Sequence, residues 1–346
     1  MCAGEQDDPS GNRVGCNPRR RSIHARQLMR VCLPAQIAVE LPGLGELVLQ
    51  PVVLDEDAAW LANLHRSCEV ARLECGSAEA VLFVEGGFAH HLVNAILGCE
   101  PVIAAGPLSR IERGLVHGAL AALSARLGFL PAVRVCAGEQ PALDSGALVL
   151  DVSICLREVL GRAWLCAPVA FLAEILSAQA PRSDALVVAL ELGRTGLPVS
   201  ELAEASEGDV VVFDGVPALP EHDPWPVQIR RGDAVATASL RPDGVLVVAG
   251  GDVADQELGT VTNADGRSKR RSGQTDRLAA NASAEVAAEL GILHGAALAA
   301  LLRDQPYDFG RGHPILMRRN GTAWAEGELF AVDNALAVRI RRKLAG

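Results

Sequence analysis

The histidines of this chain are spaced in a way that predicts no metal site. His90 and His91 are adjacent, so on a helix their rings point about 100° apart, and no third ligand is spaced to join them. We expect one of these rings to pack and the other to be solvated. His117, His294 and His313 are isolated, and we expect the first on a helix and the others in turns beside glycines.

The cysteines indicate reduced thiols, not a disulfide framework or a zinc site. There are nine, an odd number, and none forms a Cys-x-x-Cys pair. Several lie inside apolar stretches, where a free cysteine behaves as a small buried hydrophobe. All of them precede residue 170: Cys2, Cys16, Cys32, Cys68, Cys75, Cys99, Cys136, Cys155 and Cys166.

The remaining motifs predict no enzyme and no cofactor. No Gly-x-x-x-x-Gly-Lys phosphate loop occurs, and Gly106, Gly114 and Gly118 have the wrong spacing for a dinucleotide loop. No serine lies in a Gly-x-Ser-x-Gly turn. The carboxylates of Glu201–Asp209 alternate with apolar residues, as on the solvated face of a helix.

Two arginine pairs, Arg230-Arg231 and Arg318-Arg319, could hold phosphates or acidic partners. The alternative that we favour is a structural one. Charges on the solvent face of a strand prevent edge-to-edge pairing of sheets. We therefore expect Arg230 and Arg318 to lie on polar faces and to contribute little to stability.

Length and composition predict two or three aliphatic domains. The chain has 346 residues, of which 49% are hydrophobic and only 3% aromatic. Its net charge of −10 argues against a dedicated nucleic-acid binder, which would present a basic face. No run of about 18 uncharged apolar residues occurs, so we expect no membrane insertion.

The C-terminal half contains an internal repeat. Residues 185–248 and 284–344 both contain a Glu-Leu-Gly triplet, a short apolar helix, an Asp-anchored turn, an apolar residue with an Arg pair, and an alternating final strand. The triplets are Glu191-Leu192-Gly193 and Glu289-Leu290-Gly291, and we expect each to form a turn. Small gaps are needed to align the two copies.

The preceding region alternates strands and helices, which predicts a mixed α/β layer structure. Its clearest signal is Ser109 followed by Glu112, a capping box at the start of a helix. Expected strands lie within Val31–Leu54 and at Val81–Val84, Val133–Cys136, Ala147–Ile154 and Ala163–Val169; expected helices are Asp55–Ser67, Phe88–Leu97, one starting at Ser109, and Phe171–Ala178.

These patterns divide the chain into five segments. Residues 1–30 are polar and read as a disordered leader. Residues 31–180 form the α/β domain, and residues 181–250 and 283–346 the two repeat copies. Residues 251–282 have too few large apolar side chains to offset their ordering entropy, which predicts a flexible linker.

The tail resembles a SPOA (surface presentation of antigens) domain. The resemblance lies in Glu289-Leu290-Gly291, the helix and turn of Leu298–Asp308, and the segment from Arg319 through Val332 to Ile340. Residues 185–248 resemble a more divergent copy. Upstream, Phe88–Gly98 and Gly106–Arg113 resemble the middle region of flagellar switch proteins. This order is similar to that of the cytoplasmic ring proteins of type III secretion systems, the SctQ, YscQ and HrcQ family, which is related to the flagellar FliM and FliN.

The resemblance implies an α+β fold in which two β-rich SPOA domains pair as an intertwined dimer after the α/β domain. It implies a non-enzymatic scaffold of the cytoplasmic sorting platform, or C-ring, at the cytoplasmic face of the inner membrane. The implied partners are the stator, the export ATPase, the membrane-ring adaptor, chaperone–effector complexes and further SPOA domains. A flagellar motor switch component is the alternative.

A phosphatase is disfavoured. Related phosphatases carry a Glu-x-x-Asn helix signature, whereas here His91 precedes Asn94 and Leu115 follows Glu112.

A unit of about 60 residues is near the lower limit for a self-sufficient core, so apolar side chains of both copies should be buried by pairing. The expected pairing residues are Leu202, Val210, Leu240, Leu298, Leu301, Leu302, Leu329, Val332, Leu336, Val338 and Ile340.

Overall fold

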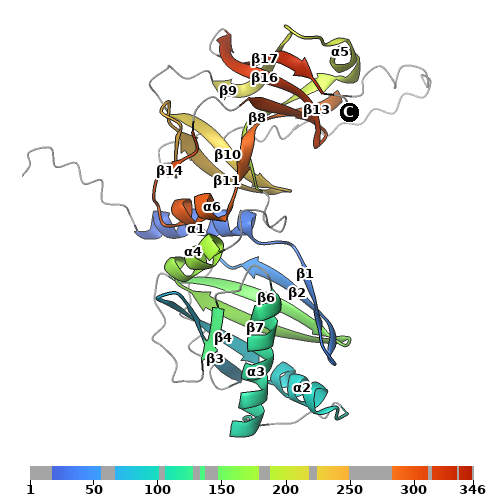
Figure 1. Cartoon of the computed structure of the whole chain (residues 1–346), viewed down its shortest axis with the longest axis vertical. Helices are drawn as coiled ribbons and strands as arrows, with labels where there is room; N and C mark the ends of the chain where they lie inside the picture. Colours follow the sequence, from blue (N-terminus) through green and yellow to red (C-terminus); the bar gives the residue numbers. More distant parts are fainter. Residues whose placement is uncertain are drawn as a thin grey trace, which may run out of the picture.

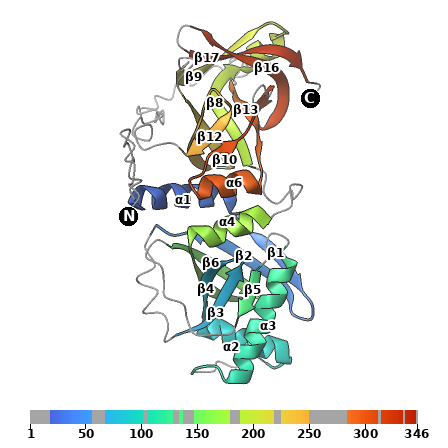
Figure 2. The same ribbon diagram turned by 60° about the vertical axis from the view of Figure 1, so that its left-hand side comes forward.

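The computed structural model shows two lobes stacked end to end, with helices α1 (Pro18–Cys32), α4 (Val169–Ala178) and α6 (Gly295–Leu302) between them (Figures 1 and 2). The fold is α+β, with many strands and few helices. None of the helices among the described residues is both long and apolar enough to cross a membrane. The structure describes residues 18–55, 67–100, 106–127, 133–136, 147–178, 188–217, 224–248, 283–310, 314–332 and 335–344.

The N-terminal lobe is built on a seven-stranded sheet in which neighbouring strands are antiparallel, in the order β1-β2-β6-β7-β4-β3-β5. The alternating pattern that predicts two strands within Val31–Leu54 is confirmed, because β1 and β2 form a hairpin there. The strands are β1 (Ile37–Leu41), β2 (Gly45–Val53), β3 (Cys68–Cys75), β4 (Ala78–Glu85), β5 (Val133–Cys136), β6 (Leu148–Leu156) and β7 (Val159–Ala167).

Two helices, α2 (Gly86–Leu97) and α3 (Arg110–Arg126), share an apolar core with this sheet. The predicted capping box is confirmed: the Glu112 amide donates to Ser109 Oγ at 3.3 Å, and the Ser109 amide donates to Glu112 Oε2 at 2.7 Å. Helix α4 (Val169–Ala178) lies at the end of the sheet that faces the second lobe (Figure 2). The helix predicted for Asp55–Ser67 falls on residues 56–66, which lie outside the described residues.

The C-terminal lobe is one ten-stranded sheet in the order β14-β12-β11-β10-β8-β13-β15-β16-β17-β9. The first copy supplies β8 (Val188–Pro198), α5 (Val199–Glu204), β9 (Val210–Pro217), β10 (Trp225–Arg231), β11 (Ala234–Leu240) and β12 (Val245–Val248). The second supplies β13 (Ser283–Leu293), α6 (Gly295–Leu302), β14 (Tyr307–Asp308), β15 (Ile315–Arg319), β16 (Thr322–Val332) and β17 (Ala335–Lys343). The predicted linker 251–282 lies outside the described residues.

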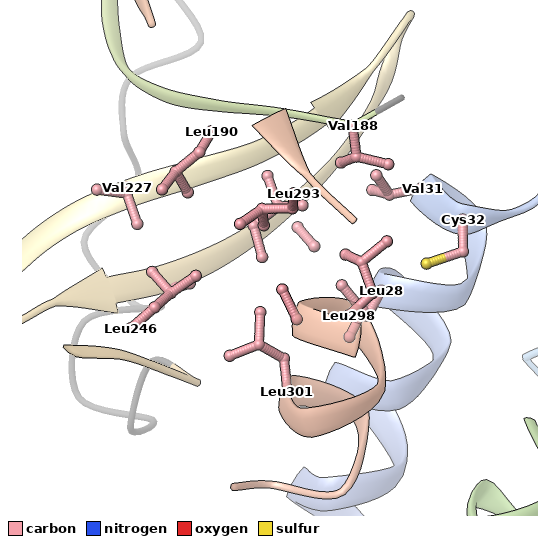
Figure 3. Packing of buried hydrophobic residues seen from close by; sticks show 14 of the residues in the cluster. Leu28, Val31, Cys32, Val188, Leu190, Val227, Leu246, Leu293, Leu298 and Leu301 are labelled. Carbon is pink, nitrogen blue, oxygen red and sulfur yellow. The ribbon is translucent and has the colours of Figure 1, made fainter. Parts of the chain in front are cut away.

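The expectation of a disordered leader through residue 30 is wrong from Pro18 onward. Residues Pro18–Cys32 form helix α1, which lies between the lobes and packs against α6 and the sheet (Figure 3). Its side chains Leu28 and Val31 are buried in a core that continues into both lobes. Arg231 Nη1 donates to the Cys32 carbonyl at 2.9 Å, at the helix end where a cation is favoured.

Burial also raises the pKa of the Cys32 thiol to about 12, so it stays protonated. The charges of Arg19, Arg20 and Arg21 conceal the apolar face of this helix in the sequence.

The expectation that the two Glu-Leu-Gly triplets form turns is wrong, because both lie inside the long strands β8 and β13. The reason is the pairing of these strands with each other, which gives both triplets a hydrogen-bonded partner. In β13 the register shifts between Glu289 and Gly291, and Gly291 has a φ of 156°. The glycine therefore marks a β-bulge in a continuous strand.

Gly161 in β7 leaves space for an aromatic ring. A Cβ built on this glycine would lie 2.4 Å from Phe88 Cγ, in the core below α2. We expect Gly161→Ala to lower the free energy of unfolding by about 1–3 kcal/mol through overpacking. Urea denaturation followed by circular dichroism measures this, with Gly114→Ala as the control, because the helical Gly114 has open space around its Cβ position. Equal stability of the two variants would contradict the expectation.

Candidate interaction surface

The two repeat copies exchange strands. Strands β8 and β13 pair antiparallel at the middle of the sheet and join the copies. Beyond them, β9 of the first copy pairs with β17 of the second, and β14 of the second pairs with β12 of the first. The corresponding strands of the copies thus occupy equivalent places on either side of the centre, and each half-sheet is completed by the other copy.

Most of the predicted pairing residues meet in the core of this lobe. Val338 and Leu298 have no exposed surface, and Leu329 is half-buried against the same core. Val332 is half-buried, whereas Val210 is 43% exposed on β9 and does not join the others. The other buried members are Leu202, Leu240, Leu301, Leu302, Leu336 and Ile340.

Two buried carboxylates lie where the copies meet. Glu191 and Glu289 occupy the same place in the two triplets and are register partners across β8 and β13. Like charges in this arrangement repel, so each requires a cation. Arg194 donates to both oxygens of Glu191, at 2.8 and 2.9 Å, and Arg230 Nε lies 3.1 Å from Glu191 Oε2. Arg318 pairs with Glu289.

The expectation that Arg230 and Arg318 are solvent-facing charges of little structural importance is therefore wrong, because both pair with buried carboxylates. The side chains of Arg230 and Arg318 are 19% and 33% exposed, and their partners Glu191 and Glu289 are almost fully buried. Bonding to Glu191 raises the pKa of Arg194 further. These three guanidinium groups are engaged by the carboxylates of Glu191 and Glu289. We therefore infer that they stabilise the pairing of β8 with β13, where the two copies meet, and that they supply no reactive group.

A second feature is an apolar groove of about 590 Å³ that both copies line. The first copy contributes Trp225 and Leu240, and the second contributes Leu290, Phe309 and Leu329. Leu240 and Leu329 belong to the predicted pairing set; the other three were missed. They are far apart in sequence and meet only through the strand exchange, so no local pattern marks them.

Charged side chains border this groove. Arg241 pairs with Asp243 at 2.6 Å, and Glu328 pairs with Arg339 at 3.4 Å and with Arg341. An apolar floor with a polar rim is the anatomy of a protein–protein interface. The groove therefore suits an apolar segment of another protein better than a polar metabolite.

The N-terminal lobe has a polar pocket of about 450 Å³ near the start of α2. Burial raises the pKa of Glu69, against the opposing effect of Arg113 and His117, whose nitrogens lie 3.5 and 3.6 Å from it. His90 is buried with Nε2 2.9 Å from the Gly106 carbonyl oxygen, and His91 is half-buried. No group of three or more metal-ligating side chains gathers among the residues that the structure describes.

FliM and FliY, which are flagellar switch proteins, are among the solved structures to which this chain is similar. The FliM middle domain from H. pylori is 16% identical, and the match covers 46% of this chain and 90% of that one, with a TM-score of 0.28. A FliG–FliM complex from H. pylori gives 15% identity, 46% and 91% coverage and a TM-score of 0.32. Thermotoga maritima FliY is 9% identical, and the match covers 45% of this chain and 88% of that one, with a TM-score of 0.32. No protein-family model matches the sequence, and no curated protein does.

Proposed function

We propose that this chain is a non-enzymatic scaffold of the cytoplasmic sorting platform of a type III protein secretion system. In that role it links the export ATPase and its stator to the membrane ring and helps to recruit chaperone–substrate complexes. The proposal rests on the sequence resemblance to the SctQ, YscQ and HrcQ family together with one structural observation. That observation is the apolar groove, which exists only because the two repeat copies are intertwined.

A flagellar motor switch component is the second candidate, favoured by the resemblance of Phe88–Gly98 and Gly106–Arg113 to switch proteins. The two candidates differ in their partners and not in their architecture. The distinction is therefore made by which machine the chain joins in the cell.

Affinity purification of the tagged full chain from the cells that express it tests both candidates. We expect the stator and export ATPase of a secretion apparatus to co-purify, and a fluorescently tagged chain to form foci at the inner membrane. Co-purification with flagellar motor proteins alone would favour the second candidate, and recovery of neither set would contradict both.

Groove variants connect this result to the structure. Phe309→Ser and Leu329→Glu change half-buried side chains of the groove and should abolish co-purification of the stator. Removing an apolar anchor from an interface costs at least about 2 kcal/mol at its central positions. Leu160→Glu is the matched control, because Leu160 is 79% exposed on the other lobe. Retention of the stator by both groove variants, with folding intact by circular dichroism, would argue against the groove as its binding site.

A further inference from the structure

Helix α1 is held between the lobes by one apolar face. Its buried side chains recur at i, i+3, i+4 and i+7, which is the spacing of one face of a helix. They are Ala25, Leu28, Met29 and Cys32, and Val31 is buried as well. Figure 3 shows Leu28, Val31 and Cys32 on the side of α1 that is directed toward α6 and the sheet. By contrast, Ile23 is 53% exposed, so α1 is an amphipathic helix.

The surface that α1 covers is made mainly by the C-terminal lobe. The helix contacts β10, β11 and α6 of that lobe, and β2 and β6 of the N-terminal lobe. Strand β11 carries the small buried side chains of Ala236 and Ala238, and α6 carries the buried Leu298 and Leu301. An apolar surface that receives one amphipathic helix is the helix-in-groove mode of protein recognition.

Helix α1 contributes little to its own stability. It is 15 residues long, and isolated helices of this length are marginal in water. Its first turn contains no acidic residue, and the sequence places Arg19, Arg20 and Arg21 there, where the helix dipole disfavours cations. The helix therefore depends on the packing of its apolar face.

The fold allows α1 to leave its site without breaking either sheet. The helix supplies no strand, and it is joined to β1 through residues 33–36. Its polar contacts include the bond from Arg231 to the Cys32 carbonyl, at 2.9 Å, and the pair of Arg30 with Asp55, at 2.6 Å. The second pair is exposed, and exposed ion pairs contribute little to stability. An element held in this way can open locally while the rest of the protein stays folded.

We propose that the surface under α1 is a helix-binding site, that α1 occupies it as an intramolecular ligand, and that an amphipathic helix of a partner protein takes the place of α1. The partner helix carries apolar residues at i, i+3, i+4 and i+7. It must compete with a tethered helix, whose effective concentration is about millimolar, so α1 excludes weak partners. Helix α1 lines no part of the apolar groove, so a failure of this inference and a failure of the proposed function are distinguishable.

The test uses the full chain and a fluorescein-labelled synthetic peptide of residues 18–33, whose binding is followed by fluorescence anisotropy. Leu28→Asp in the chain should release α1, because the new carboxylate regains water when the helix leaves. We expect this variant to bind the peptide at least about tenfold more tightly than the wild-type chain does, because its site is open. A peptide that carries Leu28→Asp should bind neither chain.

Ile23→Asp is the matched control, because it places the same charge on the exposed face of the same helix. The Ile23→Asp chain should bind the peptide as weakly as the wild type does, and an Ile23→Asp peptide should bind the Leu28→Asp chain as tightly as the wild-type peptide does. Equal binding by the two variant chains would overturn the proposal. Loss of the wild-type circular dichroism spectrum in the Leu28→Asp chain would also overturn it, because α1 would then be an integral part of the lobe.

Hydrogen exchange of the wild-type chain, followed by mass spectrometry, tests the same point without a substitution. The amides of α1 should exchange at least about tenfold faster than those of α6, because α1 opens while the lobes stay folded. Exchange of α1 as slow as that of α6 would show that the helix opens only when the lobe unfolds, which would contradict the proposal.

Discussion

Val338→Asp should unfold the C-terminal lobe or come close to doing so. Val338 has no exposed surface and lies on β17, with both strand neighbours in place, β16 on one side and the exchanged β9 on the other. An unpaired carboxylate there costs several kcal/mol even after relaxation, which is a large part of the about 5–15 kcal/mol that stabilises a typical protein. Urea denaturation followed by circular dichroism and tryptophan fluorescence measures the loss.

Val210→Asp is the matched control, because Val210 is on the strand paired with β17 but is 43% exposed. Its effect on the free energy of unfolding should stay within about 0.5 kcal/mol. A Val338→Asp protein as stable as the control would show that the strand exchange is not part of the folded state. Leu301→Asp, in α6 between the lobes, should resemble Val338→Asp.

Arg318→Met should destabilise the lobe by about 2–3 kcal/mol, because it leaves the carboxylate of Glu289 buried without its cation. The estimate is at the lower end for a buried pair because the Arg318 side chain is 33% exposed and water reaches it. Thermal or urea unfolding measures the difference.

The internal repeat supplies a comparison. Arg230→Met removes the equivalent cation of the first copy, but Glu191 keeps Arg194, so the loss should be clearly smaller. Arg319→Met, at an exposed neighbouring position, should change nothing measurable. The double variant Glu289→Leu/Arg318→Met should recover most of the stability, because both charges are then absent. Equal effects of Arg318→Met and Arg230→Met would contradict this account of the two pairs.

Features determined by neighbouring residues could be predicted from the sequence. The capping box at Ser109 and the β1–β2 hairpin depend on contacts within a few residues, and the structure has both. Helix α1 was missed because its apolar side chains are few and follow a run of arginines, while its stability comes from packing between two lobes.

The contact between β8 and β13 shows what a repeat alignment can and cannot reveal. The alignment matches Glu191 with Glu289 and Arg230 with Arg318, but it does not indicate that the carboxylates are buried or that the arginines pair with them. Burial depends on the register of β8 with β13, and this register depends on a bulge at Gly291. The apolar groove is still more difficult to predict from the sequence, because Trp225 and Phe309 come together only after both copies have folded.

The strand exchange also determines the order in which this protein can mature on the ribosome. Among the residues that the structure describes, the outer sheet partner of β12 is Tyr307–Asp308 and the sheet partner of β9 is β17, so both pairings wait for the second copy. Folding of domains during synthesis normally proceeds from the N-terminus, but here the first copy must wait for nearly the whole chain. During that interval its apolar strand β9 is exposed, so a nascent chain that stalls before residue 335 should depend on chaperones to remain soluble.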